Sequence, residues 1–447
     1  METILSAQEE MLVPGLRFEM GHTADYVTSR KMSSYFPSGS STLSPQSGAK
    51  VLRVVLGDNV WIDPSTLKVE YQFNPVGANM TPISPHGAFC FTRMRILAGG
   101  QVVEQIDHYN RTCEMYSRLL PHNTKASDAD IEGFGLEDAG KVLGAPNIAN
   151  ANFNSNVSTV PNGSSKTVQF TPLSGLVQQG RFLPLMLMGN LTLEFELVGA
   201  KQDCIQEDIA AHTWSLTFPK VSVDTLTLSA NVQEDFLRSI EAKPLDLQMS
   251  TFISMAQQIN GPSARISFSR AVTELKGVWC TLWGRIIATA NAAQPPAANK
   301  VDSAESLAMQ RKLPEGSAFL HPANPELTVQ IGSHRWPDFP LNNTPAFYNA
   351  LKKSIGLHAI RDGMDLSKAS YEGSCFIAGI DLERLMHVTK SGISLRAGES
   401  LQLDWKNLTT DGTTLAGTDP SNLSMAYVVM EVGQVVRIGI GGLEVLD

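Results

Sequence analysis

The chain has 447 residues, of which 43% are hydrophobic and 18% are charged. This is a globular composition, and the length exceeds that of one typical domain, so we expect two domains or one elaborate one. The formal net charge of −9 argues against direct, sequence-specific binding to nucleic acid, which needs a concentrated basic surface. The opening METILSAQEEMLVPGL carries glutamates where a signal peptide needs positive charge, so no secretion signal is predicted.

The sequence gives no support for membrane insertion, disulfides or metal sites. No window approaches the roughly 18 apolar residues of a membrane-spanning helix. The cysteines are odd in number and never spaced C-x-x-C, and no histidine pair sits at metal-ligand spacing beside a carboxylate. We therefore expect reduced, buried thiols and neither a metal ion nor a cofactor. The five cysteines are Cys90, Cys113, Cys204, Cys280 and Cys375.

Alternation of apolar and polar residues recurs along the chain and predicts β-strands. In residues 66–74, TLKVEYQFN, every second side chain is apolar, as in a strand with one face on a core. Antiparallel sheets give this alternation, so we expect a mostly antiparallel β protein. Glu194 falls on the polar face of such a segment, and Phe218 on the apolar face of another. The further alternating segments are 191–198 (LTLEFELV), 213–218 (TWSLTF) and 399–405 (ESLQLDW).

Clusters of glycine, proline and serine predict turns. The Asp-Pro-Ser segment 63–65 is expected to form the turn between strands at 50–56 and 66–73. The glycine-rich segment 439–442 has no helix after it, so we interpret its glycines as turn or bulge residues.

The stretch 104–121, EQIDHYNRTCEMYSRLLP, contains most of the side-chain types used in catalysis, but its periodicity predicts an amphipathic helix. Asp107 and His108 are the best candidate acid–base pair, yet adjacent residues on a helix point about 100° apart, so no catalytic dyad is expected. The predicted apolar face holds Ile106, Tyr109, Cys113, Tyr116 and Leu120. The predicted solvated side holds Asp107, Arg111, Glu114 and Arg118.

Two further helices are predicted from their capping residues. In 344–356, TPAFYNALKKSIG, Thr344 is the expected N-cap and Pro345 the first helical residue. In 231–244, NVQEDFLRSIEAKP, Asn231 is the expected N-cap and a glutamate follows three residues later, as in a capping box.

The matches to catalytic motifs in this sequence are of a kind that arises readily by chance. The S-x-x-K spacing occurs at 47–50 and 65–68 without the S-D-N or K-T-G partners of a β-lactamase-like site. The sequence has no G-x-S-x-G, P-loop or H-E-x-x-H, and no G-x-G-x-x-G that opens a helix after a strand. We therefore predict no catalytic, cofactor-binding or metal-binding residues, and a protein that is not an enzyme.

The predicted elements come in an order that repeats once. A strand ending in Gly99-Gly100 precedes the first helix, and a strand ending in a Gly332 turn precedes the helix of 344–356. Each helix is followed by an apolar segment and two strands, which predicts two similar β domains in tandem. The predicted units are an N-terminal arm at 1–30, domains at 31–230 and 246–447, and a linker helix at 231–245.

Two segments lack strand patterning. Residues 123–165 are rich in Asn, Ser, Gly and Asp, and 291–316 contain NAAQPPAANK. We expect both to be long surface loops, which in a β scaffold are common places for partner contacts.

A series of segments resembles one known family. Residues 34–56, SYFPSGSSTLSPQSGAKVLRVVL, followed by WIDPSTLKVEYQF at 61–73, resemble the N-terminal region of double jelly-roll major capsid proteins. The family occurs in polinton-like viruses, adintoviruses and virophages. Further similar blocks follow in the family's order from residue 99 almost to the C-terminus. They are 99–121, 171–198 (containing TPLSGL and FLPL), 266–282, 329–348 and 392–405.

The resemblance implies an all-β chain of two tandem eight-stranded jelly rolls with a few short helices in the connections. It also implies homotrimers that form pseudo-hexagonal capsomers of an icosahedral virion shell around double-stranded DNA, assembled inside the host cell. The implied partners are neighbouring capsomers, penton proteins and minor capsid proteins.

Two alternatives stay open. The first is a glycan-binding or glycan-hydrolysing tandem jelly roll, which would need paired carboxylates in a groove or exposed aromatic platforms. The aromatic content of 7%, mostly at predicted core positions, argues against it. The second is a minor virion protein.

Overall fold

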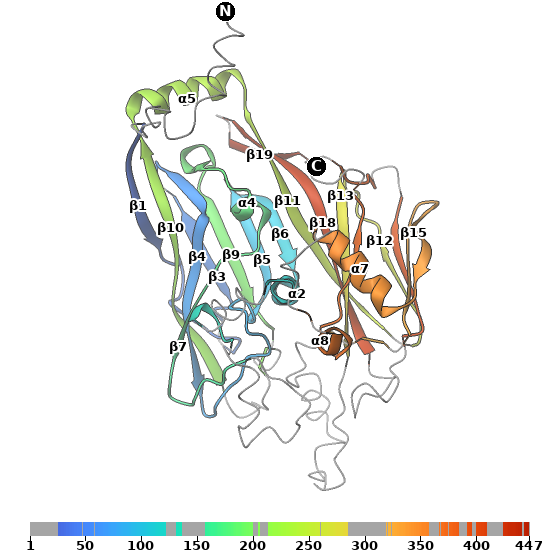
Figure 1. The fold of residues 1–447 in the computed structure, drawn as a ribbon. Helices are drawn as coiled ribbons and strands as arrows, with labels where there is room; N and C mark the ends of the chain where they lie inside the picture. The colour runs from blue at the N-terminus through green and yellow to red at the C-terminus, as the bar shows by residue number, and fades with distance from the viewer. Residues whose placement is uncertain are drawn as a thin grey trace, which may run out of the picture.

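A computed structural model of the protein shows two β-rich halves side by side, with the helix α5 (Ala230–Ala242) across one end (Figure 1). The structure describes residues 26–46, 48–57, 59–121, 131–135, 157–199, 204–205, 213–259, 261–284, 319, 321–322, 324–356, 366, 368–373, 375–383, 391–395, 399–408, 423–439 and 442–446. The predicted loop 291–316, most of the loop 123–165 and most of the arm 1–30 lie outside these residues.

The first half consists of a six-stranded and a four-stranded antiparallel sheet. Its strands are β1 (Val27–Tyr35), β2 (Thr42–Leu43), β3 (Val51–Leu56), β4 (Trp61–Val76), β5 (Phe91–Ala98), β6 (Gln101–Asp107), β7 (Lys166–Phe170), β8 (Leu183–Pro184), β9 (Leu191–Leu197) and β10 (Thr213–Leu228). One sheet has the order β1-β10-β4-β7, with β2 on β10 and β8 on β4, and the other has the order β3-β9-β5-β6.

The second half consists of a five-stranded and a four-stranded antiparallel sheet. Its strands are β11 (Leu245–Gln258), β12 (Ala264–Phe268), β13 (Leu275–Gly284), β14 (Glu326–Ile331), β15 (His334–Leu341), β16 (Ala378–Asp381), β17 (Leu401–Lys406), β18 (Leu423–Gly439) and β19 (Gly442–Leu446). One sheet has the order β11-β18-β13-β16, with β19 on β18, and the other has the order β12-β17-β14-β15.

The two halves share one strand order. Leaving aside the short β2 and β8 and the terminal β19, each half has eight principal strands, paired 1-8-3-6 in one sheet and 2-7-4-5 in the other. Two such sheets packed face to face form a jelly roll. The predicted fold class, two tandem eight-stranded jelly rolls with few helices, is confirmed.

Short helices lie in the connections. They are α2 (Tyr109–Arg118), α4 (Gly175–Gln178), the 3-10 helix η3 (Leu185–Leu187), α5, α7 (Thr344–Ser354) and α8 (Lys368–Gly373). The helices α2 and α7 both follow the fifth principal strand of their jelly roll, so the predicted repeat of strand, turn and helix is present. In the described ranges, no helix has the length and apolar character needed to cross a bilayer.

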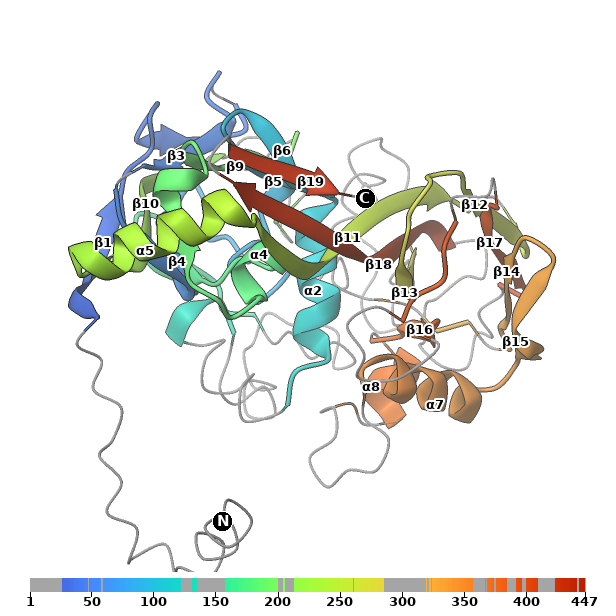
Figure 2. The same ribbon diagram turned by 90° about the horizontal axis from the view of Figure 1, so that it is seen from above.

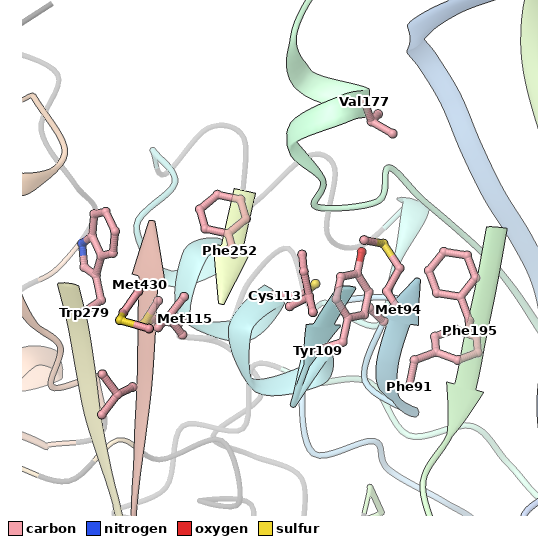
Figure 3. Close-up of a cluster of buried hydrophobic side chains, with 14 of the residues drawn as sticks. Phe91, Met94, Tyr109, Cys113, Met115, Val177, Phe195, Phe252, Trp279 and Met430 are labelled. Carbon is pink, nitrogen blue, oxygen red and sulfur yellow. The ribbon is translucent and has the colours of Figure 1, made fainter. Parts of the chain in front are cut away.

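The alternating strands bury the predicted faces. On β4, Val69, Tyr71 and Phe73 are fully buried, and on β17, Leu403 and Trp405 are at most 1% exposed. One cluster of buried apolar residues includes members from both halves. Figure 3 shows part of it, in which α2 lies between strands of the first and second jelly rolls.

Three strand predictions are wrong in detail. Phe218 is 72% exposed and has a positive φ of 50°, because the register of β10 against β4 shifts there and a bulge turns this side chain outward. Segment 63–65 lies inside β4, where the Asp63 carboxylate accepts hydrogen bonds from Ser65 and mimics turn chemistry within a strand. Glu194 is 7% exposed and pairs with Arg53 on β3.

The helix starts also differ from the predictions. The helix α2 begins at Tyr109, because residues 101–107 form β6. His108, which lies between the two elements, has a left-handed backbone conformation with φ 47°. The N-cap of α7 is Asn343, whose side chain accepts a hydrogen bond from the Ala346 N–H, and the N-cap of α5 is Ser229.

The predicted turn near the C-terminus is confirmed. Strands β18 and β19 form a hairpin in which Gly439 pairs with Gly442, and Gly442 has a φ of 114°. This backbone conformation is accessible to glycine at little cost.

Candidate functional site: the interface between the two jelly rolls

The stretch 104–121 lies between the two jelly rolls. We use the name jelly-roll interface for the contact that β6, α2 and α4 make with β11, β13 and β18. One face of α2 packs on the first jelly roll, where the rings of Tyr109 and Phe195 lie 5.9 Å apart and the Leu173 N–H donates to the Tyr109 hydroxyl. The predicted apolar face of the helix is therefore correct for Tyr109, and for Cys113 beside it (Figure 3).

Apolar residues on α2 also contact the second jelly roll. The Tyr116 ring lies 4.9 Å from that of Phe252 on β11 and 5.7 Å from that of Trp279 on β13. Met115, which is 1% exposed, and Met430 of β18 belong to the same cluster of buried apolar side chains (Figure 3). Both sides of this short helix are thus covered by protein. A surface helix, in contrast, has one side on the core and the other in solvent.

The side of α2 that was predicted to be solvated is buried, and this prediction is wrong. Glu114 is 1% exposed and receives hydrogen bonds from Arg111 and Arg118, at 3.3 Å each. Burial raises the pKa of Glu114, and the two guanidinium groups oppose that shift. The Glu114 carboxylate pairs with both guanidinium groups at helical spacings of three and four residues, which offsets part of the cost of burying the three side chains.

Both arginines also reach the second jelly roll. The Arg111 guanidinium lies over the rings of Trp283 and Tyr427, at 5.6 and 5.9 Å from their centroids. Arg118 donates to the Cys375 thiol at 3.1 Å. The planar, weakly hydrated guanidinium is suited to such stacked and desolvated positions.

A buried carboxylate on β6 connects three segments. Glu104 is 2% exposed and accepts hydrogen bonds from the Gly175 N–H (2.9 Å), the Thr251 hydroxyl on β11 (2.7 Å) and the Ser174 hydroxyl. Burial raises the pKa of Glu104, and these donors oppose that shift. Since Ser174 and Gly175 belong to the start of α4 and Thr251 to the second jelly roll, one side chain fixes all three.

The segment α4 approaches β11 closely at Gly175. A Cβ atom built on this residue would overlap the Ser250 carbonyl oxygen. Ser174 caps α4 by accepting from the Val177 N–H. The approach therefore needs a residue without a side chain.

The candidate pair Asp107 and His108 lies at the edge of the jelly-roll interface. The Asp107 carboxylate accepts hydrogen bonds from Arg93 (2.6 Å) and Gln105, and its backbone carbonyl accepts one from Ser254 of the second jelly roll. Partial burial raises the pKa of Asp107, but these hydrogen bonds outweigh it and the net pKa is lowered. The His108 ring lies 5.6 Å from the Tyr427 ring, and burial lowers its pKa.

A cleft of about 290 Å³ opens at the interface between α4, β11 and β18. Lys276 donates to the Ser250 hydroxyl at 2.9 Å, and the Glu431 carboxylate is held by the same hydroxyl. Burial raises the pKa of Glu431. Ser250 thus connects Lys276 and Glu431, two charged residues of the cleft lining.

Within the described ranges, no group of three or more His, Cys, Asp and Glu side chains could hold a metal ion. All five cysteines are buried and free, as predicted. Burial raises the pKa of Cys113 to about 12 and that of Cys280 to about 12, which leaves unreactive thiols.

No protein-family model and no curated protein matches the chain. The fold is similar to the PBCV-1 virus capsid (TM-score 0.61, 13% identity, 96% of this chain and 99% of that one) and to the Faustovirus major capsid protein (0.60, 8%, 97% and 94%). It is also similar to the mavirus major capsid protein (0.51, 7%, 98% and 94%). The chain thus has the double jelly-roll fold of these capsid proteins along nearly its whole length.

Proposed function

We propose that the chain is a major capsid protein that assembles as homotrimeric, pseudo-hexagonal capsomers of an icosahedral shell around a double-stranded DNA genome. The fold similarity covers 94% or more of this chain and of the Faustovirus and mavirus major capsid proteins. The virion is the proposed location, after assembly inside the host cell.

The observation that carries this proposal is the pairing of two jelly rolls with one strand order in a single block. Their strands pair 1-8-3-6 and 2-7-4-5 in both halves, and a continuous apolar core joins them. Three such blocks around an axis would place six similar β units in a ring, and closed cyclic symmetry would satisfy every contact between copies.

We propose that the chain is divided into domains at the boundaries expected from the sequence. They are a first jelly roll at 31–230, a linker helix at 231–245 and a second jelly roll at 246–447, with an arm at 1–30. The continuous core between the halves supports a rigid relation of the jelly rolls, which a shell needs.

We propose a structural protein without catalysis. The buried carboxylates Glu104 and Glu114 are engaged by hydrogen bonds that hold the jelly-roll interface together, and Asp107 is engaged by Arg93. These are the side chains that made the stretch 104–121 resemble an active site.

The proposed partners are neighbouring capsomers, penton proteins and minor capsid proteins. The net charge of −9 per chain supports a shell that does not bind DNA in a sequence-specific way and that contacts it weakly or through a basic protein.

The copy number in purified particles tests the proposal. We expect this chain to be the most abundant polypeptide by quantitative mass spectrometry, and cryo-electron microscopy of the particles to show its double jelly rolls tiling the shell. A few copies per particle would instead indicate a minor virion protein. Hydrolysis of glycans by the purified chain would favour the enzymatic alternative and contradict the proposal.

A further inference from the structure

The cleft at the jelly-roll interface has walls from both jelly rolls. The helix α4 of the first jelly roll forms one wall, and it lies next to β11 of the second in both Figure 1 and Figure 2. The other walls come from β11, β18 and the start of β13. The volume of about 290 Å³ is near the lower end of the range of about 300–1,000 Å³ that is usual for small-molecule sites. A small ligand in this cleft would therefore contact both jelly rolls.

The lining combines exposed amide groups with buried apolar side chains. Gln178 of α4 and Gln248 of β11 are exposed, so they belong to the rim of the cleft. Met249 and Phe252 of β11 are each 6% exposed. An alkyl chain can pack on these apolar side chains, while the amide oxygens at the rim can accept hydrogen bonds from a donor at its end.

The charged groups around Glu431 do not balance. Lys276 donates to the Ser250 hydroxyl at 2.9 Å and not to a carboxylate. Burial raises the pKa of Glu431, and the negative charges of Asp381 and Glu383 raise it further. Ser250 and Lys276 oppose this rise. Negative charge is therefore in excess on this side of the cleft.

Glu274, directly before β13, has a carboxylate oxygen without a hydrogen-bond partner. Its Oε1 is shielded from water and has no partner among the residues that the structure describes. The carboxylate lies against Gly433, where a Cβ atom would come within 2.5 Å of Oε2. An unpaired buried polar group costs about 1–3 kcal/mol. Since Glu274 also lines the cleft, a ligand there can supply the missing donor.

The carboxylates of Glu274 and Glu431 are neighbours on one face of β18. Glu431 pairs with Phe252 and Gly433 pairs with Ser250 in a regular antiparallel register, so residues 431 and 433 point to the same face. The Glu274 carboxylate occupies the place that a side chain at position 433 would take. Two adjacent carboxylates of this kind attract a cation that donates hydrogen bonds.

We propose that the cleft is a binding site for a small alkyl diammonium ion. One ammonium group donates to Glu274 and Glu431, the alkyl chain lies along Phe252, and the other ammonium group reaches Gln178 at the rim. Because Gln178 belongs to the first jelly roll and the two carboxylates to the second, the bound ion links them. The site lies within a single chain and goes beyond the proposed capsid function.

The chemistry of the lining favours an organic ammonium ion over a metal ion. Within the described ranges, no group of three or more His, Cys, Asp and Glu side chains could hold a metal. Metal ions such as Ca²⁺ take about six to eight oxygen ligands. An ammonium group needs only about three acceptors, which the carboxylates and amides provide, and its alkyl chain matches the apolar part of the lining.

Isothermal titration calorimetry of the full chain with 1,4-diaminobutane tests the site directly. At constant ionic strength and a pH of about 8, where the diamine carries two charges, we expect saturable binding of one diamine per chain. The control is 1-aminobutane, which has the same alkyl chain and one ammonium group and should bind at least about tenfold more weakly. No saturable binding of the diamine up to about 10 mM would overturn the proposal, and so would equal affinity for the two amines.

A matched pair of variants locates the bound ion. Glu274→Gln keeps the shape of the side chain and removes its charge, so we expect at least about tenfold lower affinity for the diamine. Glu241→Gln removes the same charge from an exposed position on α5 outside the cleft lining and should bind like wild type. Wild-type affinity in the Glu274→Gln variant would overturn the assignment.

A substitution at the rim gives a second test that does not disturb buried groups. Gln178 is exposed, so Gln178→Lys should leave the melting temperature without ligand unchanged. The added ammonium group repels the diamine, and we expect at least about fivefold lower affinity. The diamine should raise the melting temperature of wild type more than that of the variant, because binding to the folded state stabilises it. Equal affinity of the two proteins would contradict the placement of the ligand across the cleft.

Discussion

The helices α2 and α7 occupy the same place in the two jelly rolls, after the fifth principal strand, but they are covered differently. The helix α2 is enclosed, with Glu114 at 1% exposed and with contacts to both jelly rolls. The helix α7 buries Phe347 and Leu351 on its own jelly roll, and its sixth residue, Asn349, is exposed. The difference shows that strand order sets where a helix lies, whereas the next jelly roll decides what its outer face must contain.

The largest expected effect comes from removing the support under α2. Phe195 is fully buried and its ring packs on Tyr109. Phe195→Asp would bury an unpaired carboxylate at a cost of several kcal/mol, comparable with the stability of a domain. We expect no soluble folded protein, measured by expression yield and circular dichroism. A variant that keeps a folded second jelly roll would show that α2 does not couple the halves.

The next effect compares equivalent positions of the two helices. Glu114→Gln leaves Arg111 and Arg118 buried without their anion, which we expect to cost about 3 kcal/mol in the free energy of unfolding. Asn349→Ala on α7 should change it by less than about 0.5 kcal/mol, because that side chain is exposed. Urea denaturation measures both. Similar losses in the two variants would mean that the helices are not covered differently after all.

Two glycine substitutions test the close approach of α4 to β11. Gly175→Ala forces α4 away from Ser250 of β11, and we expect a loss of about 2 kcal/mol. Gly261→Ala, where a Cβ has nothing within 4 Å, is the control and should be neutral or slightly stabilising. Thermal unfolding gives the readout, and a Gly175→Ala protein as stable as the control would contradict the close approach.

The smallest expected effect is a pH dependence of stability that arises from His86 in the first jelly roll. Burial lowers the pKa of His86 to about 4, and its Nδ1 accepts from the Ala88 N–H. Its neutral form therefore stabilises the fold fully above the usual pKa near 6.5, and this contribution is lost as the pH falls towards 4.

Between pH 7 and pH 5, wild type should lose about 1–2 kcal/mol more stability than His86→Asn, whose amide oxygen keeps the acceptor without titrating there. Urea midpoints at the two pH values test this. Parallel losses in the two proteins would remove His86 as the cause.

The strands and their faces could be predicted from the sequence because burial of one face imposes a period of two. Residues 66–74 and 399–405 show this alternation, and both have the predicted faces buried. The repeated order of strand, turn and helix was also visible, since Gly99-Gly100 and Gly332 mark equivalent turns.

The interface could not be predicted in the same way. Helical periodicity separates two faces of α2, but it does not say what each face meets. Arg111, Glu114 and Arg118 look like a solvated face, yet they form ion pairs with one another and contact the second jelly roll, and so they can be buried. The spacing of an acid between two arginines, at three and four residues, was the available signal, and exposed helices carry it too.

The central claim is that this chain forms a closed ring of three copies, and native mass spectrometry of the purified protein at low salt tests it most directly. The account predicts a dominant species of three chains of 48.5 kDa each, which forms at the expense of the monomer as the concentration rises. A monomer of 48.5 kDa that persists across all concentrations would contradict it.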